Sequence, residues 1–81
     1  MRRLRRLSGA ELVQVLRGFG FAVQSQHGSH IKLRRTLPDG VSQTLTVPAP
    51  GTVKLGTLHA IFTQAARFIP ERELRPHFYT D

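Results

Sequence analysis

Three side chains that could do chemistry alternate along one segment of the sequence. His30, Lys32 and Arg34 occupy every second position of an expected β-strand over residues 30–35. Because successive side chains of a strand point to opposite faces, these three share one face and the apolar residues between them share the other. Histidine exchanges protons near neutral pH, and fixed cations stabilise negative charge on a phosphate. The pattern suits cleavage of a phosphodiester, but it is also that of a solvated basic strand with an incidental histidine.

The residues just before this strand extend the candidate site. Gly28 leaves room for a phosphate to approach the backbone N–H groups of Gly28 and Ser29. The Ser29 hydroxyl could instead hydrogen-bond the local backbone of the turn. His27 could supply a proton as an acid, or it could be an exposed loop residue. His27 and His30 do not predict a metal site, because no carboxylate or thiol lies near them in the sequence to complete a ligand set.

The other titratable residues do not form a second constellation. His59 falls between the apolar positions of an expected helix, so it is expected on the polar face, and His77 belongs to the C-terminal segment. The five acidic residues are scattered and offer no carboxylate pair, which argues against a two-metal nuclease or a glycosidase. We therefore expect no metal and no cofactor.

Charge and composition indicate a partner that is itself acidic. The net charge is +7, and all of the excess falls within residues 1–54, whereas residues 55–81 are neutral. Such a field favours a polyanion or an acidic protein. The chain has no cysteine and no apolar run long enough to span a bilayer. These features fit a reducing, cytoplasmic setting.

Two helices and three strands are expected to position the candidate residues. Ser8 and Glu11 have the spacing of a capping box and begin a helix that continues to about Phe19. A second helix is expected to begin near Leu55, with Thr57 as its N-cap. Alternating apolar residues predict strands at residues 21–26, 30–35 and 43–47.

The alternation also predicts which side chains are buried. In the first strand, Phe21 and Val23 are expected to face the core, and Ala22, Gln24 and Gln26 to face outward. The predicted core consists of Leu12, Leu16, Phe21, Val23, Ile31, Leu33, Leu45, Leu58, Ile61 and Phe62.

The order of elements predicts an α+β fold in a single domain. It is α-β-β-β-α, in which a three-stranded antiparallel sheet carries both helices on one face. The domain is expected to cover residues 1–81, with a core at about 8–75, a basic N-terminal segment at 1–7 and a C-terminal tail at 76–81. The second face of the sheet is left polar and basic.

Five short motifs occur in one order between Ser8 and about Leu74. They are Ser8-Gly9-x-Glu11-Leu12, Gly20-Phe21, Gly28-Ser29-His30, Val47-Pro48 and Leu55-Gly56-Thr57-Leu58-x-x-Ile61. Each motif is weak alone, but in this order and spacing the set resembles the HicA-type toxins, also called YcfA-like, a family of small ribonucleases. The resemblance covers nearly the whole chain.

The resemblance implies a fold like that of double-stranded-RNA-binding domains, cleavage of messenger RNA by one essential histidine, and neutralisation by a HicB-type antitoxin. Carried over by motif, the catalytic histidine is His30. The chain departs from the family after the proline that ends the third strand. Many members have a basic residue and a histidine there, and this chain has Ala49 and Pro50.

Three functions follow as alternatives. The first is a metal-independent endoribonuclease toxin with His30 as base and with Gly28, Ser29, Lys32 and Arg34 binding RNA. The second is a small RNA-binding module that uses the same basic face without catalysis. The third is a subunit whose basic face only binds an acidic protein partner.

Overall fold

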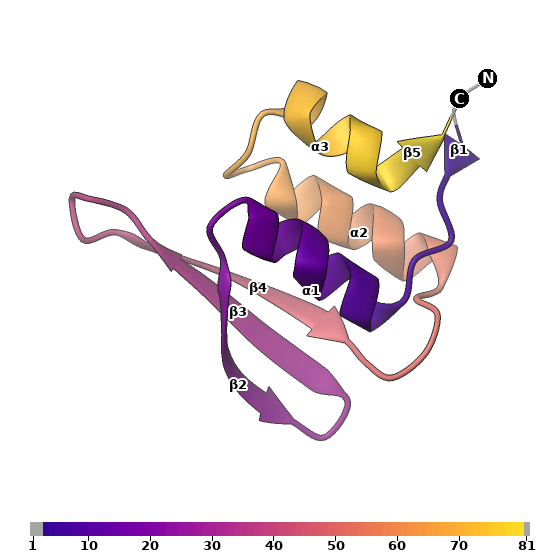
Figure 1. The fold of residues 1–81 in the computed structure, drawn as a ribbon, viewed down its shortest axis with the longest axis horizontal. Helices are drawn as coiled ribbons and strands as arrows, with labels where there is room; N and C mark the ends of the chain where they lie inside the picture. The colour runs from indigo at the N-terminus through magenta and orange to yellow at the C-terminus, as the bar shows by residue number, and fades with distance from the viewer. Residues whose placement is uncertain (1–2, 81) are drawn as a thin grey trace.

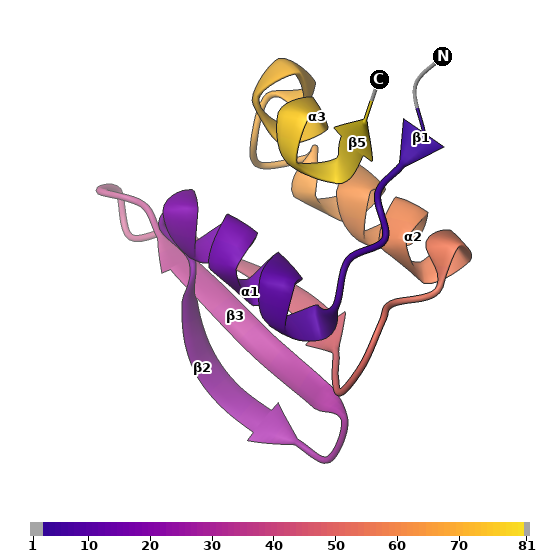
Figure 2. The same cartoon turned by 45° about the vertical axis from the view of Figure 1, so that its right-hand side comes forward.

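The structure is a computed structural model that describes residues 3–80, and its three-stranded sheet is covered by helices on one face (Figure 1). Figures 1 and 2 show α1 and α2 against this face, with α3 on the side of α2 remote from the sheet. This confirms the predicted α+β class. The elements are β1 (Arg3–Leu4), α1 (Gly9–Gly18), β2 (Ala22–His27), β3 (His30–Thr36), β4 (Ser42–Pro48), α2 (Leu55–Ala65), α3 (Glu71–Phe78) and β5 (Tyr79–Thr80).

Helix α1 begins at the predicted capping box. The Ser8 hydroxyl accepts a hydrogen bond from the Glu11 backbone N–H at 3.0 Å, and the Glu11 carboxylate accepts one from the Ser8 N–H at 2.9 Å. These two bonds, together with the charge of Arg5, hold the pKa of Glu11 below its ordinary value. The first turn of α1 also lies against the end of β4, because a Cβ on Gly9 would collide with the carbonyl oxygen of Pro48.

The main sheet has the antiparallel order β2-β3-β4, with β3 in the centre. On β3 and β4, Leu33, Leu45 and Val47 are buried beneath the helices. Their neighbours along each strand point to the opposite, uncovered face, which we call the open face. The predicted alternation of β3 and β4 is therefore confirmed.

A β-bulge changes the alternation of β2. Val23 pairs with Leu33, but the next pair is Ser25 with Lys32, so Gln24 is an extra residue in β2. Beyond the bulge, the odd-numbered side chains of β2 point to the open face instead of the helix side. Residues 25 and 27 therefore share the open face with their partners on β3. The outward orientation expected for Gln26 is wrong, because Gln26 pairs with Ile31 on the helix side.

The buried core agrees with the prediction except on β2. Val23 was expected inside but is 48% exposed, because it lies next to the bulge on an edge strand. Ile31 is partly buried against the core. The other predicted core residues are buried. Val47 and Ala65 are also buried, as expected from the spacing of the third strand and the second helix, and the core further contains Leu7, Val13, Val53, Ile69, Leu74 and Phe78.

Arg35 joins the middle strand to the ends of two helices. Its guanidinium is half-buried on the helix side of the sheet and donates hydrogen bonds to the carbonyl oxygens of Phe19 at 2.9 Å and Phe68 at 3.0 Å. It also donates to Gln43 on β4 at 2.8 Å and lies 4.9 Å from the ring centroid of Phe21. These contacts fix β3, and with it the residues on the open face.

The C-terminal segment packs on the domain. The residues expected as a tail, 76–81, complete α3 up to Phe78 and then form β5, which pairs with β1; Asp81 lies outside the described residues. Phe78 is fully buried, and its ring centroid lies 5.3 Å from that of Phe62. Of the basic N-terminal segment expected at 1–7, residues 1 and 2 also lie outside the described part.

Candidate active site

The open face of the sheet carries the three alternating polar residues of the central strand. His30, Lys32 and Arg34 are exposed on β3, opposite Pro48, Thr46 and Thr44 of β4 respectively. Within residues 3–80, the side chains of Lys32 and Arg34 form no hydrogen bond or ion pair. Two cations are therefore available to an anionic ligand on the same face as a histidine.

The turn between β2 and β3 holds His30 at the start of β3. Gly28 has φ +57° at the first position of the two-residue turn, where glycine is favoured because a side chain would be strained. The carbonyl oxygen of Ser29 accepts a hydrogen bond from the Ala49 N–H at 2.7 Å. This bond ties the turn to the residues that follow β4, so the position of His30 is fixed from both neighbouring strands.

His27 lies directly across from His30. It is the last residue of β2 rather than a loop residue, and the two histidines form the final pair of the hairpin. Both side chains are exposed. The sequence alone is compatible with His27 as an acid or as an exposed loop residue, because the bulge that turns it to the open face has no clear sequence signal.

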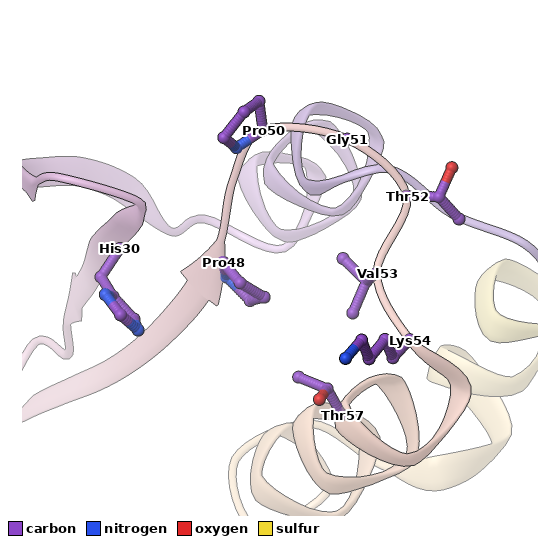
Figure 3. A pocket seen from close by; sticks show the side chains of 8 residues that line it. All are labelled: His30, Pro48, Pro50, Gly51, Thr52, Val53, Lys54 and Thr57. Carbon is purple, nitrogen blue, oxygen red and sulfur yellow. The ribbon is translucent and has the colours of Figure 1, made fainter.

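A pocket of about 340 Å³ adjoins His30 on the other side, between the end of β4 and the start of α2. Figure 3 shows His30 and Lys54 on opposite sides of Pro48, with the Lys54 ammonium pointing into the hollow. Thr57 lies below it. The pocket is lined by His30, Pro48, Pro50, Gly51, Thr52, Val53, Lys54 and Thr57.

Helix α2 begins near Leu55 as predicted, but its N-cap differs from the prediction. Lys54 is the N-cap and the helix begins at Leu55, so the expectation that Thr57 caps the helix is wrong. The Lys54 side chain makes no cap hydrogen bond to the first turn of α2, and N–H groups at a helix N-terminus favour anions. Lys54 was not among the predicted site residues. Its place near His30 depends on the path of residues 49–53, which sequence spacing does not give.

The other histidines lie elsewhere in the molecule. His59 is exposed on α2, as expected. The His77 ring packs edge-on against the ring of Phe19 between α3 and α1, and the two ring centroids are 5.4 Å apart. Among residues 3–80, no group of three or more His, Asp or Glu side chains is placed to hold a metal ion. No helix in this range is long and apolar enough to cross a membrane.

A comparison with protein families accounts for the motifs. The family described as "HicA toxin of bacterial toxin-antitoxin" matches residues 9–66, well over half of the chain. The chain belongs to the HicA toxin family. It is thus related to the toxins of bacterial toxin–antitoxin systems. No significant match to a curated protein or to a solved structure was found.

The matched range of this HicA-family chain contains every residue of the site. It runs from the first residue of α1 to the residue after α2, and so includes the hairpin, the open face and the pocket. It begins at Gly9, the residue whose missing side chain allows α1 to approach β4. Helix α3 and strand β5 lie beyond the match.

Proposed function

We propose that this protein is a metal-independent endoribonuclease that cleaves messenger RNA with His30 as the general base. The observation that carries the proposal is the position of His30. In a chain of the HicA toxin family, His30 is exposed as the first residue of the central strand β3. It lies on the same face as Lys32 and Arg34 and at the rim of a pocket.

The chemistry needs only groups of this kind. A neutral imidazole of His30 takes the proton of a ribose 2′-OH, and the resulting 2′-oxygen attacks the adjacent phosphorus. The bond to the 5′-oxygen then breaks, which leaves a 2′,3′-cyclic phosphate and a 5′-hydroxyl. Negative charge grows on the phosphate oxygens during the attack, and nearby cations stabilise it. Lys32 and Arg34 fit this role.

The surroundings of His30 suit the chain of an RNA rather than an isolated phosphate. Lys32 and Arg34 continue along β3 on one side, and Lys54 and the N-terminus of α2 lie across the pocket on the other. Phosphates flanking the cleaved bond would bind these cations, with the turn at Gly28 and Ser29 allowing close approach of the backbone. Lys54 would supply the basic group that the segment after Pro48 lacks.

The same open face is the surface that a HicB-type antitoxin would cover. The protein belongs to a family of toxins of toxin–antitoxin systems, and its net charge of +7 favours an acidic partner. Binding of such a partner over His30 would block RNA by occupying the same cations.

A non-catalytic RNA-binding module is the second candidate. It is favoured by the sequence after β4, where Ala49 and Pro50 replace the basic residue and histidine of many HicA-type toxins. Both candidates predict RNA binding, so cleavage separates them.

The proposal is tested by the chemistry of cleavage in vitro. The purified protein should cleave an all-ribose RNA in the presence of EDTA, because the base is a side chain and not a metal-bound hydroxide. The same RNA with a single deoxyribose at the mapped cleavage site should stay intact at that site, since the nucleophile is missing. Cleavage of the deoxyribose substrate, or loss of cleavage in EDTA, would contradict the mechanism.

A further inference from the structure

The pairing of His27 with His30 gives the open face two histidines side by side. They come from different strands and are directly opposed in the antiparallel register. Directly opposed residues on one face of a sheet have Cβ atoms about 4.5–5.5 Å apart. Two imidazoles at that spacing can lie on either side of one phosphate.

The bulge at Gln24 is what creates this pair. If the pairing of Val23 with Leu33 continued without an extra residue, Gln26 would lie opposite His30 and His27 would point to the helix side. The extra residue moves His27 into register with His30 and turns it to the open face. Bulges next to active sites often re-aim a side chain in this way.

We propose that His27 is the general acid of the reaction and protonates the leaving 5′-oxygen. This inference rests on the proposed function, in which His30 is the base. The 2′-OH proton passes to neutral His30, the 2′-oxygen–phosphorus bond forms and the phosphorus–5′-oxygen bond breaks. The 5′-oxygen takes a proton from the His27 imidazolium. The reaction therefore begins with neutral His30 and protonated His27 and ends with the opposite charges.

The charged neighbours of His27 on this face do not fit the role of acid. Lys32 and Arg34 are a lysine and an arginine, and these residue types are general acids far less often than histidine. The nearest acidic residues in sequence are Glu11, which is held in the capping box, and Asp39, which lies in the turn beyond β3. The Asp39 carboxylate accepts a hydrogen bond from the Val41 N–H there.

The test uses a leaving group that needs no proton. An RNA in which sulfur replaces the 5′-oxygen at the cleaved bond leaves as a thiolate without an acid. His27→Ala should slow cleavage of the ordinary RNA by about 10²–10⁴-fold, the usual contribution of general acid–base catalysis, and should cleave the sulfur substrate at nearly the wild-type rate. His30→Ala should be slow on both substrates, because the base is still needed.

Two control variants make the result specific. His59→Ala removes an exposed histidine of α2 and should change neither rate. Adding Gln26→His to His27→Ala puts a histidine on the helix side of β2 and should not restore cleavage of the ordinary RNA. Unchanged melting temperatures and RNA affinities would show that each variant still folds and binds.

The outcomes separate the two proposals. If the wild type cleaves neither substrate, the proposed function itself is wrong. If the wild type cleaves and His27→Ala cleaves ordinary RNA at the same rate, the function stands and His27 is not the acid. An equal loss on both substrates would also overturn the inference, since His27 would then act in binding or folding.

Discussion

Arg34 and Arg35 are neighbours on β3 with opposite surroundings. Arg34 points to the open face and is exposed, whereas Arg35 points to the helix side and donates three hydrogen bonds to half-buried acceptors. A guanidinium can hold several acceptors at once because its five N–H groups lie in one plane. The same residue type therefore serves folding at Arg35 and is exposed, where the proposed function places RNA binding, at Arg34.

This contrast predicts different costs for the same substitution. Arg35→Met should lower the free energy of unfolding by about 2 kcal/mol, because it leaves two backbone carbonyls and the Gln43 side chain without their donor. Arg34→Met should change it by less than about 0.5 kcal/mol, as is usual for exposed residues. Urea unfolding of both variants measures the difference. Equal effects would mean that the contacts of Arg35 contribute little to stability.

Lys32 should act on RNA through its charge alone. Lys32→Ala is expected to weaken RNA binding across sequences and to reduce the slope of log K against log salt by about one contact. Arg72→Ala is the matched control, because it removes one positive charge from α3, away from the sheet. Affinities measured at several salt concentrations check this. If both variants changed binding alike, net charge and not the open face would explain the affinity.

At the scale of elements, α1 is held against the end of β4 by close backbone contact. Gly9→Ala should destabilise the protein by about 1–3 kcal/mol, since its Cβ would meet the Pro48 carbonyl and backbone atoms cannot easily give way. Gly18→Ala, in the last turn of the same helix, meets open space and should be stabilising. Thermal unfolding of the pair tests this. A neutral Gly9→Ala would show that the two elements can move apart freely.

The N-terminus of α1 predicts part of the acid sensitivity. The pKa of Glu11 is lowered by its hydrogen bonds with Ser8, so its contribution to stability is present above the ordinary glutamate pKa of about 4.3. It is lost as the pH falls below that value through the lowered pKa of the folded state. Glu11→Gln should therefore be less stable than the wild type near neutral pH, with the difference shrinking in acid. Denaturation at a series of pH values measures this, and a constant difference would contradict it.

The elements that sequence analysis predicted are those with local signals. The capping box of Ser8 and Glu11, the alternation of β3 and the apolar spacing of α2 are each set by neighbouring residues. The predictions of a buried Val23 and of Thr57 as the N-cap of α2 were wrong, and the pairing of His27 was not foreseen. A bulge depends on pairing with another strand, and the N-cap of α2 depends on the path of the preceding loop, so neither can be derived from spacing alone.

At the scale of the whole molecule, charge follows the division of the fold only in part, because Arg3 and Arg5 lie beside β5 and α3 rather than on the sheet. The basic excess lies in residues 1–54, which supply the whole sheet, and the neutral remainder supplies α2, α3 and β5. Helix α3 covers the helical layer with Leu74 and Phe78 buried in the core and lies away from the open face. Within residues 3–80, no helix covers the open face, while the other side of the sheet builds the core.

The most direct measurement compares transcripts in cells that express the wild type or His30→Ala at equal levels. The account predicts growth arrest and new internal 5′ ends in messenger RNA with the wild type, and neither with the variant. The variant should keep the melting temperature and the RNA affinity, because His30 is exposed and both Lys32 and Arg34 remain. If both proteins bound RNA, left transcripts intact and were equally harmless, the protein would be a binding module and the catalytic assignment of His30 would be wrong.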